Sequence, residues 1–195
     1  MSIIIKSAEK PKKIIIPSGT HIARCYSMIH IGHQEFEWQG ETKKTNRIRI
    51  SFELPFETRS FNGEEKPLVI EKEYTLRLHE KSNLWKDLEI AEFDITKLLG
   101  VPCNLSIIHR ESNSGNNYAT ISNISKITKG VEVPEPFNNL FEFNFTDKFN
   151  EEWLEESCPS WILEQIKNSD EYKSLKREKV KSKIDTSILE DFEDD

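Results

Sequence analysis

The stretch Arg47-Ile48-Arg49-Ile50-Ser51-Phe52-Glu53-Leu54 alternates between polar and apolar side chains. A period of two is typical of a β-strand that buries one face and exposes the other. The next residue, Pro55, has no backbone N–H, so it is predicted to end the strand. One face is therefore core, and the other begins with two arginines.

Four further runs have strand character. The run before the alternating stretch follows a turn at residues 16–19, and the run after it places Lys72 as an exception on its apolar face. The last two runs are joined by the turn residues 113–117 and are predicted to form a hairpin. Residues 33–44 carry a turn signal at 39–42 and are expected to form a mobile hairpin loop. The predicted strands are residues 21–31, 47–54, 68–78, 103–109 and 118–124.

The period changes between the third and fourth predicted strands. Leu84, Trp85, Leu88 and Ala91 fall at helical spacing after Ser82, which is typical of a helix cap. Three strands, a helix and two strands is the element order of the OB-fold. We therefore predict a mainly β protein with a five-stranded, OB-fold-like Greek-key barrel and a helix between strands 3 and 4.

Charge divides the chain of 195 residues unevenly. Residues 1–133 hold 19 Lys and Arg against 17 Asp and Glu, whereas residues 134–195 hold 8 against 17. The length fits one domain with an appendage. We predict four parts: an N-terminal arm (1–19), an OB-fold domain (20–133), a Phe- and Trp-rich extension with a short helix (134–170), and a flexible tail, basic and then acidic (171–195).

The composition argues against several classes of protein. No run approaches the roughly 18 apolar residues of a membrane helix, and no signal peptide is evident, so we expect an intracellular protein without membrane contact. The three cysteines are widely spaced and are expected to be free thiols. His30 and His33 lack a second ligand pair, and no phosphate loop or nucleophile elbow occurs. We expect neither enzymatic activity nor a cofactor or metal.

Four segments resemble a group of small proteins of tailed phages: residues 16–25, 72–84, 98–103 and 117–121. The resemblance covers about residues 14–130. It implies membership of the OB-fold single-stranded DNA-binding proteins of phage replication modules, acting in the cytoplasm of the infected bacterial host during DNA replication or recombination. It does not by itself fix binding positions.

Binding single-stranded DNA without a sequence code requires cations for the phosphates and flat side chains on which bases stack. Cationic and aromatic residues cluster around the second strand and the last hairpin, which an OB barrel would bring to one surface. The candidate nucleic-acid-binding residues are Phe36, Trp38, Lys43, Lys44, Arg47, Arg49, Arg77, Arg110 and Tyr118.

Each candidate has a purely structural alternative. Arg47, Arg49 and Arg77 could be the solvated face of a half-buried sheet, paired across strands to Glu71 and Glu73. Trp38 is the strongest candidate, because a large aromatic side chain in a polar loop is costly to expose without a partner.

The C-terminal end resembles the acidic, Phe-bearing peptide with which bacterial single-stranded DNA-binding proteins recruit replication enzymes. Here Phe192 lies three residues before the end, and plain solubility is an equal alternative. The candidate partner-binding residues are Leu189, Asp191, Phe192, Asp194 and Asp195. We expect replication or recombination proteins as partners, and the Phe-rich extension packs either on the barrel or on a second subunit of a homodimer.

A second function class stays open on the sequence alone. The same barrel could be a protein-interaction or structural module that binds proteins through its Phe-rich arm and has no affinity for nucleic acid.

Overall fold

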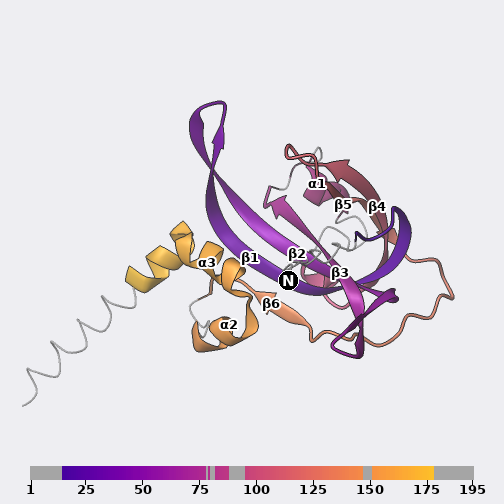
Figure 1. Cartoon of the computed structure of the whole chain (residues 1–195). Coiled ribbons are helices and arrows are strands. Elements are labelled where there is room, and N and C mark those ends of the chain that lie inside the picture. The colour runs from indigo at the N-terminus through magenta and orange to yellow at the C-terminus, as the bar shows by residue number, and fades with distance from the viewer. Residues whose placement is uncertain (1–14, 78, 80–81, 88–94, 147–150, 178–195) are drawn as a thin grey trace, which may run out of the picture.

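The computed structural model describes residues 15–77, 79, 82–87, 95–146 and 151–177 (Figure 1). Its strands are β1 (Gly19–Trp38), β2 (Glu41–Phe61), β3 (Glu64–Thr75), β4 (Pro102–Glu111), β5 (Asn117–Lys126) and β6 (Phe141–Phe143). Its helices are α1 (Asn83–Asp87), the 3-10 helix η2 (Ile95–Leu98), α2 (Glu151–Ser157) and α3 (Ser160–Asn168). Residues 170–177 are also helical.

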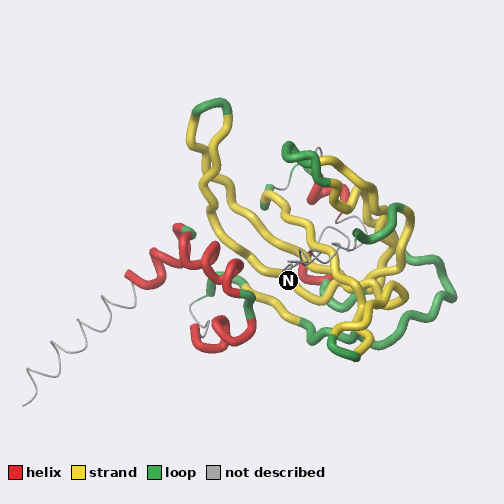
Figure 2. Tube along the Cα trace, in the orientation of Figure 1, coloured by secondary structure: helices red, strands yellow, loops and turns green. Residues whose placement is uncertain are grey.

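The strands form one curled sheet with the order β3-β2-β1-β4-β5, in which all neighbours are antiparallel. The sixth strand, β6, adds to β1 in parallel and was not anticipated from the sequence. The path ends at β3 and β5, and no backbone pairing joins these two strands within the described residues, so the predicted closed barrel is not observed. The protein is mainly β, with an open antiparallel sheet and short C-terminal helices beside the β1–β2 hairpin (Figure 2).

The predicted turn within residues 39–42 is confirmed, but the loop predicted over residues 33–44 is mostly paired strand. Strands β1 and β2 stay paired as far as Trp38 and Glu41, and only Gln39 and Gly40 form the turn. Both turn residues have positive φ, 53° and 79°, which is the backbone of a type I′ turn. Such a turn matches the right-handed twist of the flanking strands, so the polar sequence around it continues as a long hairpin that projects from the sheet (Figure 1).

The prediction that Pro55 ends its strand is also wrong. Strand β2 continues to Phe61, and its pairing with β3 has an irregularity between Leu54 and Thr58. Pro55 lies inside this irregular stretch, where the ladder does not need its missing N–H. The bulge therefore allows the strand to pass a residue that would otherwise break the pairing.

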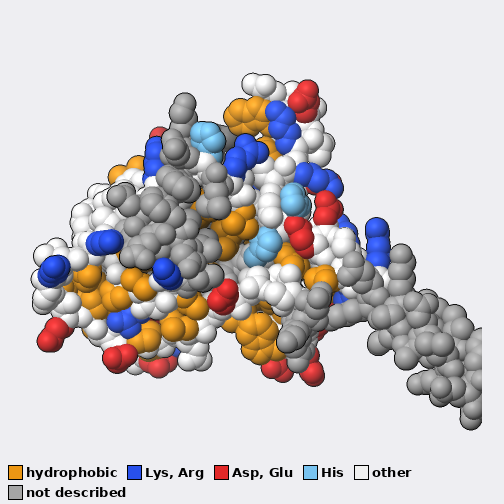
Figure 3. Space-filling model, turned by 180° about the vertical axis from the view of Figure 1, so that it is seen from behind, with side chains coloured by type: hydrophobic (Ala, Val, Ile, Leu, Met, Phe, Trp, Pro, Cys, Tyr) orange, Lys and Arg blue, Asp and Glu red, His pale blue; other side chains and the backbone are white. Residues whose placement is uncertain are grey.

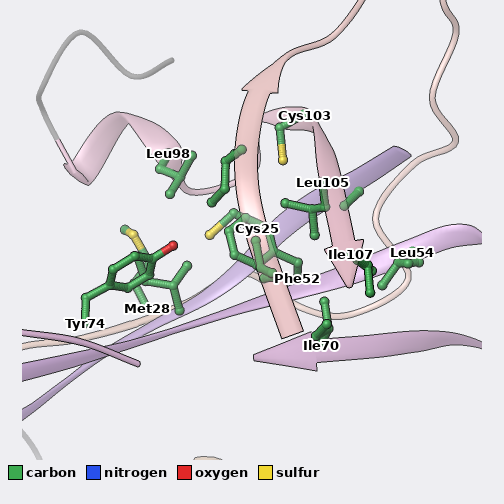
Figure 4. Close-up of a cluster of buried hydrophobic side chains, with 14 of the residues drawn as sticks. Cys25, Met28, Phe52, Leu54, Ile70, Tyr74, Leu98, Cys103, Leu105 and Ile107 are labelled. Carbon is green, nitrogen blue, oxygen red and sulfur yellow. The ribbon is translucent and has the colours of Figure 1, made fainter. Parts of the chain in front are cut away.

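The main core lies inside the curl of the sheet (Figure 4). The apolar face predicted for β2 is buried there, with Ile48, Ile50, Phe52 and Leu54 all at 7% exposure or less. Leu98 of η2 and Leu105 of β4 belong to the same buried cluster inside the curl. The pattern of β2 thus identified the core face correctly.

Lys72, the exception on the apolar face of β3, is explained by the short helix α1. The Nζ atom of Lys72 donates to Oδ2 of Asp87 at 2.7 Å, and the hydroxyl of Tyr74 donates to the same oxygen at 2.9 Å. Burial, with Asp87 beside it, raises the pKa of Tyr74, so the hydroxyl keeps its proton and remains a donor. This polar contact connects β3 to α1 at the rim of the core.

A second core lies on the opposite side of β1. Ile29 and Ile31 of β1 pack against Leu154 of α2 and against Ile162 and Ile166 of α3. The aromatic side chains of the extension complete this cluster, because β6 buries Phe143, and Phe141 and Phe145 pack beside it. The Phe- and Trp-rich extension therefore packs on its own chain.

The buried carboxylate of Glu53 fixes the path of the connection from β5 to β6. The pattern of β2 predicts an exposed position, yet Glu53 is only 1% exposed. Its two oxygens accept hydrogen bonds from the backbone N–H of Phe137 (3.1 Å) and of Asn138 (2.9 Å), and from the side-chain amide of Asn138 (2.7 Å). The carboxylate thus ties the extension to the outer face of the sheet.

Replacing Glu53 by Ala should destabilise the protein by about 3 kcal/mol, because three donors lose a buried acceptor that carries charge. Urea unfolding followed by circular dichroism measures the change. The matched control is Glu65→Ala on the exposed part of β3, which should stay within about 0.5 kcal/mol of the parent. Equal effects of the two substitutions would contradict the role of Glu53 as an anchor.

The three cysteines are free and buried, in accord with the sequence. Burial raises the pKa of Cys103 to about 12 and that of Cys158 to about 11, and burial followed by the proximity of Cys103 raises the pKa of Cys25 further. The thiolate is the reactive form, so the thiols should be protected in the folded protein.

At pH 8, iodoacetamide should therefore modify Cys25 and Cys103 at a rate at least about tenfold lower in the native protein than in 6 M guanidinium chloride. Peptide mass spectrometry resolves the three sites. Rapid native modification of Cys25 or Cys103 would show that the main core is open.

Candidate nucleic-acid interface

The β1–β2 hairpin carries six of the nine predicted binding residues. In its register Phe36 lies opposite Lys43, and Arg47 and Arg49 follow on alternate positions of β2. Residues directly opposite each other share a face of the sheet, and so do residues two apart. We call the side that presents Phe36, Trp38, Lys43, Arg47 and Arg49 the hairpin face.

The arginines of the hairpin face are paired to acids of the neighbouring strand. Arg47 donates to Glu73 at 2.5 Å, and Arg49 donates to Glu71 at 2.9 Å and to Glu73 at 2.8 Å. These are the cross-strand pairs that formed the structural alternative for Arg47 and Arg49. Since the side chain of Arg49 is only 13% exposed, much of its charge is already neutralised within the protein.

Both guanidinium groups also lie against aromatic rings. The central carbon of Arg47 is 5.0 Å from the ring centroid of Phe36, and that of Arg49 is 4.4 Å from the ring centroid of Trp161. Trp161 belongs to α3, so the C-terminal extension reaches the hairpin face. An arginine plane covered on one side by a ring is held in a fixed orientation.

The helical residues after α3 place two carboxylates on the hairpin. Lys44 donates to both oxygens of Asp170, at 3.0 and 3.2 Å, and also pairs with Glu35. One oxygen of Glu171 accepts from the backbone N–H of His33 at 2.8 Å, and the other lies 2.5 Å from Nδ1 of the same histidine. The extension thereby covers the edge of β1 beyond β6.

These contacts shift the acid–base equilibria of the groups that make them. The hydrogen bond to Asp170 raises the pKa of Lys44, and the same bond lowers the pKa of Asp170. For Glu171, burial acts to raise the pKa, but the hydrogen bonds from His33 outweigh it and the net shift is downward. All three groups are therefore held in their charged forms at neutral pH.

Three predicted residues at this end of the sheet stay open to solvent. Trp38 is 56% exposed beside the turn, and Lys43 makes only a long contact of 3.7 Å with Glu41. Arg77 follows β3 and lines a shallow pocket together with Thr45 and Glu73, which places it next to the hairpin face. Within the described residues, neither Trp38 nor Arg77 has a side-chain hydrogen bond or ion pair.

The two remaining candidates lie elsewhere, so the expectation that all nine converge on one surface is wrong. Arg110 and Tyr118 are cross-strand neighbours on the β4–β5 hairpin. This hairpin extends past Gly19 at the start of β1, whereas Trp38 lies at the end of β1. The long β1 separates the two groups.

Tyr118 lines a groove that the sequence did not reveal. The β3–β5 groove has a volume of about 670 Å³ and lies where the ends of the open sheet approach each other. Its lining includes Arg59, Phe61, Lys66, Val69, Tyr118 and Phe137. The three aromatic side chains are between 42% and 57% exposed, and Nζ of Lys66 is 5.9 Å from the ring centroid of Phe137.

The signals for this groove were present in the sequence but were divided among separate segments. Phe61 directly precedes the turn Asn62-Gly63 between β2 and β3, and Phe137 belongs to the extension. Only the fold places these residues with Tyr118. Arg59 has no ion pair with another described residue, whereas Lys66 pairs with Glu64 at 3.0 Å.

Positive charge is not continuous over the surface. On the side seen in Figure 3, Lys and Arg side chains alternate with Asp and Glu, and apolar side chains lie between them. Such a surface gives weak non-specific attraction for a polyanion, so any binding would rely on local clusters.

Among the described residues, no group of three or more His, Cys, Asp or Glu side chains is arranged to hold a metal ion. No helix in the described part of the chain is long and apolar enough to cross a membrane. The predicted acidic partner-binding residues, from Leu189 to Asp195, lie outside the described residues.

In comparisons with known proteins, no family model matches the chain, and no curated protein is significantly similar to it.

The contact between Arg49 and Trp161 should be measurable as a coupling free energy. A double-mutant cycle of Arg49→Gln and Trp161→Leu should give about 1 kcal/mol in urea unfolding, because the stacked guanidinium is largely shielded from water. The control cycle pairs Arg47→Gln with Trp161→Leu and should give a value near zero. A coupling below about 0.3 kcal/mol in the first cycle would show that α3 does not engage the hairpin face.

Proposed function

We propose that this protein binds single-stranded DNA without strong sequence preference, as a member of the OB-fold group of phage proteins. The strand order supports the fold assignment, because pairing β3 with β5 would close the same sheet into a five-stranded Greek-key barrel. We regard the sheet as an OB-type barrel that is open at this seam, with α1 and η2 in the connection between β3 and β4.

The observation that carries the proposal is the β3–β5 groove. Phe61, Tyr118 and Phe137 expose flat faces around one concave surface, and Arg59 and Lys66 supply cations beside them. Exposed aromatic side chains with neighbouring cations are the elements that bind unpaired bases and their phosphates in non-specific complexes. Arg110, the cross-strand neighbour of Tyr118, adds a third cation at the same end.

The hairpin face is proposed as a second contact region. Trp38 is exposed beside the turn, Lys43 lies opposite Phe36, and Arg77 lies close to Arg47. The guanidinium groups of Arg47 and Arg49 already lie over the rings of Phe36 and Trp161, and arginine contributes similar cation–π contacts to bases. A strand that follows the curl of the sheet would meet the groove and this face in turn.

The cellular role is part of the same proposal. The protein would act in phage DNA replication or recombination, in the cytoplasm of the infected bacterium, by binding rather than by catalysis. Residues 189–195 would recruit replication or recombination proteins through their carboxylates and Phe192. Self-association into a homodimer remains an open part of the proposal.

A protein-interaction module without affinity for nucleic acid is the second candidate. It is favoured by one observation, that Arg47 and Arg49 already have acidic partners in the protein and offer little free charge to phosphates. The same exposed aromatic side chains would then contact a protein partner.

Titration of a fluorescein-labelled dT20 oligonucleotide, followed by anisotropy at two salt concentrations, tests the proposal. The parent protein should bind saturably at low salt and more weakly at high salt. The double variant Phe61→Ala/Tyr118→Ala should bind at least about tenfold more weakly, because each stacked base contributes about 1 to 3 kcal/mol. Trp38→Ala should reduce affinity independently.

Phe56→Ala is the matched control, because Phe56 is exposed to the same 57% as Phe61 but lines none of the described grooves. Its affinity should stay within about twofold of the parent. Absence of saturable binding at low salt would remove DNA binding as the function. Normal binding by the Phe61→Ala/Tyr118→Ala variant would remove the groove as its site.

A further inference from the structure

The C-terminal extension places anionic groups where a nucleic acid would place phosphates. Asp170 offers both carboxylate oxygens to Lys44, within 3.2 Å. Glu171 engages the backbone N–H and the ring of His33. Lys44 and His33 lie on neighbouring parts of the β1–β2 ladder, so two adjacent carboxylates of one helix occupy two adjacent positions of the hairpin.

The same extension places a flat ring where a nucleic acid would place a base. Trp161 lies 4.4 Å from the guanidinium carbon of Arg49, and Gln165, one turn further along α3, lies 3.5 Å from Nη2 of Arg49 through its side-chain oxygen. A ring on the guanidinium plane and a polar oxygen at its edge are the contacts that an arginine makes with a stacked nucleotide.

The polar contacts and the apolar anchor of the extension are separate. Ile162 and Ile166 of α3 are buried against Ile29 and Ile31 of β1 and hold the helix in place. Asp170 is about half exposed, and exposed ion pairs contribute little to stability. Glu171 is less exposed, at 22%, but like Asp170 it lies outside the apolar anchor, so both carboxylates can leave the hairpin while α3 stays docked.

We propose that Asp170 and Glu171 act as an internal competitor of single-stranded DNA on the β1–β2 hairpin. In the free protein they occupy Lys44 and His33, and Trp161 covers Arg49. When DNA binds, its phosphates replace the two carboxylates and a base replaces the indole ring, without undocking of α3. The inference rests on the proposed function and adds its regulation. The two carboxylates and the indole ring keep the affinity of the hairpin for single-stranded DNA below the value that its cationic side chains would give without them.

The test compares three full-length proteins in the dT20 titration at low salt. Asp170→Asn/Glu171→Gln removes the competing charges and keeps the shape of both side chains. Glu156→Gln/Glu164→Gln removes two charges from α2 and α3, where both side chains are exposed and neither pairs with a described residue of the hairpin. It therefore controls for the general effect of net charge on affinity for a polyanion.

The Asp170→Asn/Glu171→Gln variant should bind roughly 3- to 10-fold more tightly than the parent, as expected when two carboxylates with weak polar contacts no longer compete. The control variant should stay within about twofold of the parent. Equal affinity of the two variants, or weaker binding by Asp170→Asn/Glu171→Gln, would overturn the inference while leaving DNA binding intact. Absence of saturable binding by all three proteins would instead remove the proposed function, and the inference with it.

Hydrogen exchange gives a second readout that folding defects do not imitate. Addition of dT20 to the parent protein should change exchange at the amide of His33, because a phosphate replaces the carboxylate of Glu171 as its acceptor, and should leave α3 protected. Unchanged exchange at His33 in a saturated complex would contradict displacement. Loss of protection throughout α3 would contradict the local exchange of side chains and indicate undocking.

Discussion

Strand β1 connects every part of the sheet, because its two edges are hydrogen-bonded to three different strands. One edge pairs with β2 along most of its length, and the other pairs first with β4 and then with β6. Two irregularities in the pairing with β2, at residues 25–27 and 30–32, bend the strand along the way. The main core lies inside this bend, and the second core lies on its outer side. The β3–β5 groove and the hairpin face thus lie toward opposite ends of one strand.

The charges of the outer surface are arranged mainly in pairs. Arg47 and Arg49 face Glu73 and Glu71, Lys44 faces Asp170, and the buried Glu53 is satisfied by backbone and amide donors. Such pairing stabilises a half-buried polar face, but it leaves little net charge to attract a polyanion. Binding of DNA on this surface would therefore depend on stacking and on exchange of ion partners. This is the physical reason for giving the aromatic groove more weight than the arginines of β2.

The sequence predicted those features that depend on local pattern. The alternation from Ile48 to Leu54 identified the core face of β2, and the turn at residues 113–117 identified the β4–β5 hairpin. It failed where tertiary context outweighs local preference. Pro55 suits a bulge as well as a strand end, and a polar sequence with Gln39-Gly40 suits a long hairpin as well as a loop.

Local sequence patterns also did not predict the parts of the candidate site that combine distant segments of the chain. Trp38 was correctly expected to be exposed, but the contacts of Lys44 with Asp170 and of Arg49 with Trp161 and Gln165 come from α3 and the residues after it, more than 100 positions along the chain. The groove combines β2, β3, β5 and the extension, so no single segment carries its signature. The placement of α3 on the hairpin depends on the second core, which includes Ile29, Leu154 and Ile166. The hydrophobic period of a segment predicts which of its residues are buried, but it does not predict which distant residues they pack against.

The proposed function requires that unpaired bases stack on the aromatic side chains of the curled sheet. Photo-cross-linking with an oligonucleotide that contains 5-iodouracil, followed by peptide mass spectrometry, tests this claim most directly, because cross-links form with the rings that contact the base. The account predicts cross-links to Phe61, Tyr118 or Phe137, together with Trp38. Cross-links confined to residues 171–195 would contradict it, because DNA would then be held by the basic part of the tail instead of by the sheet.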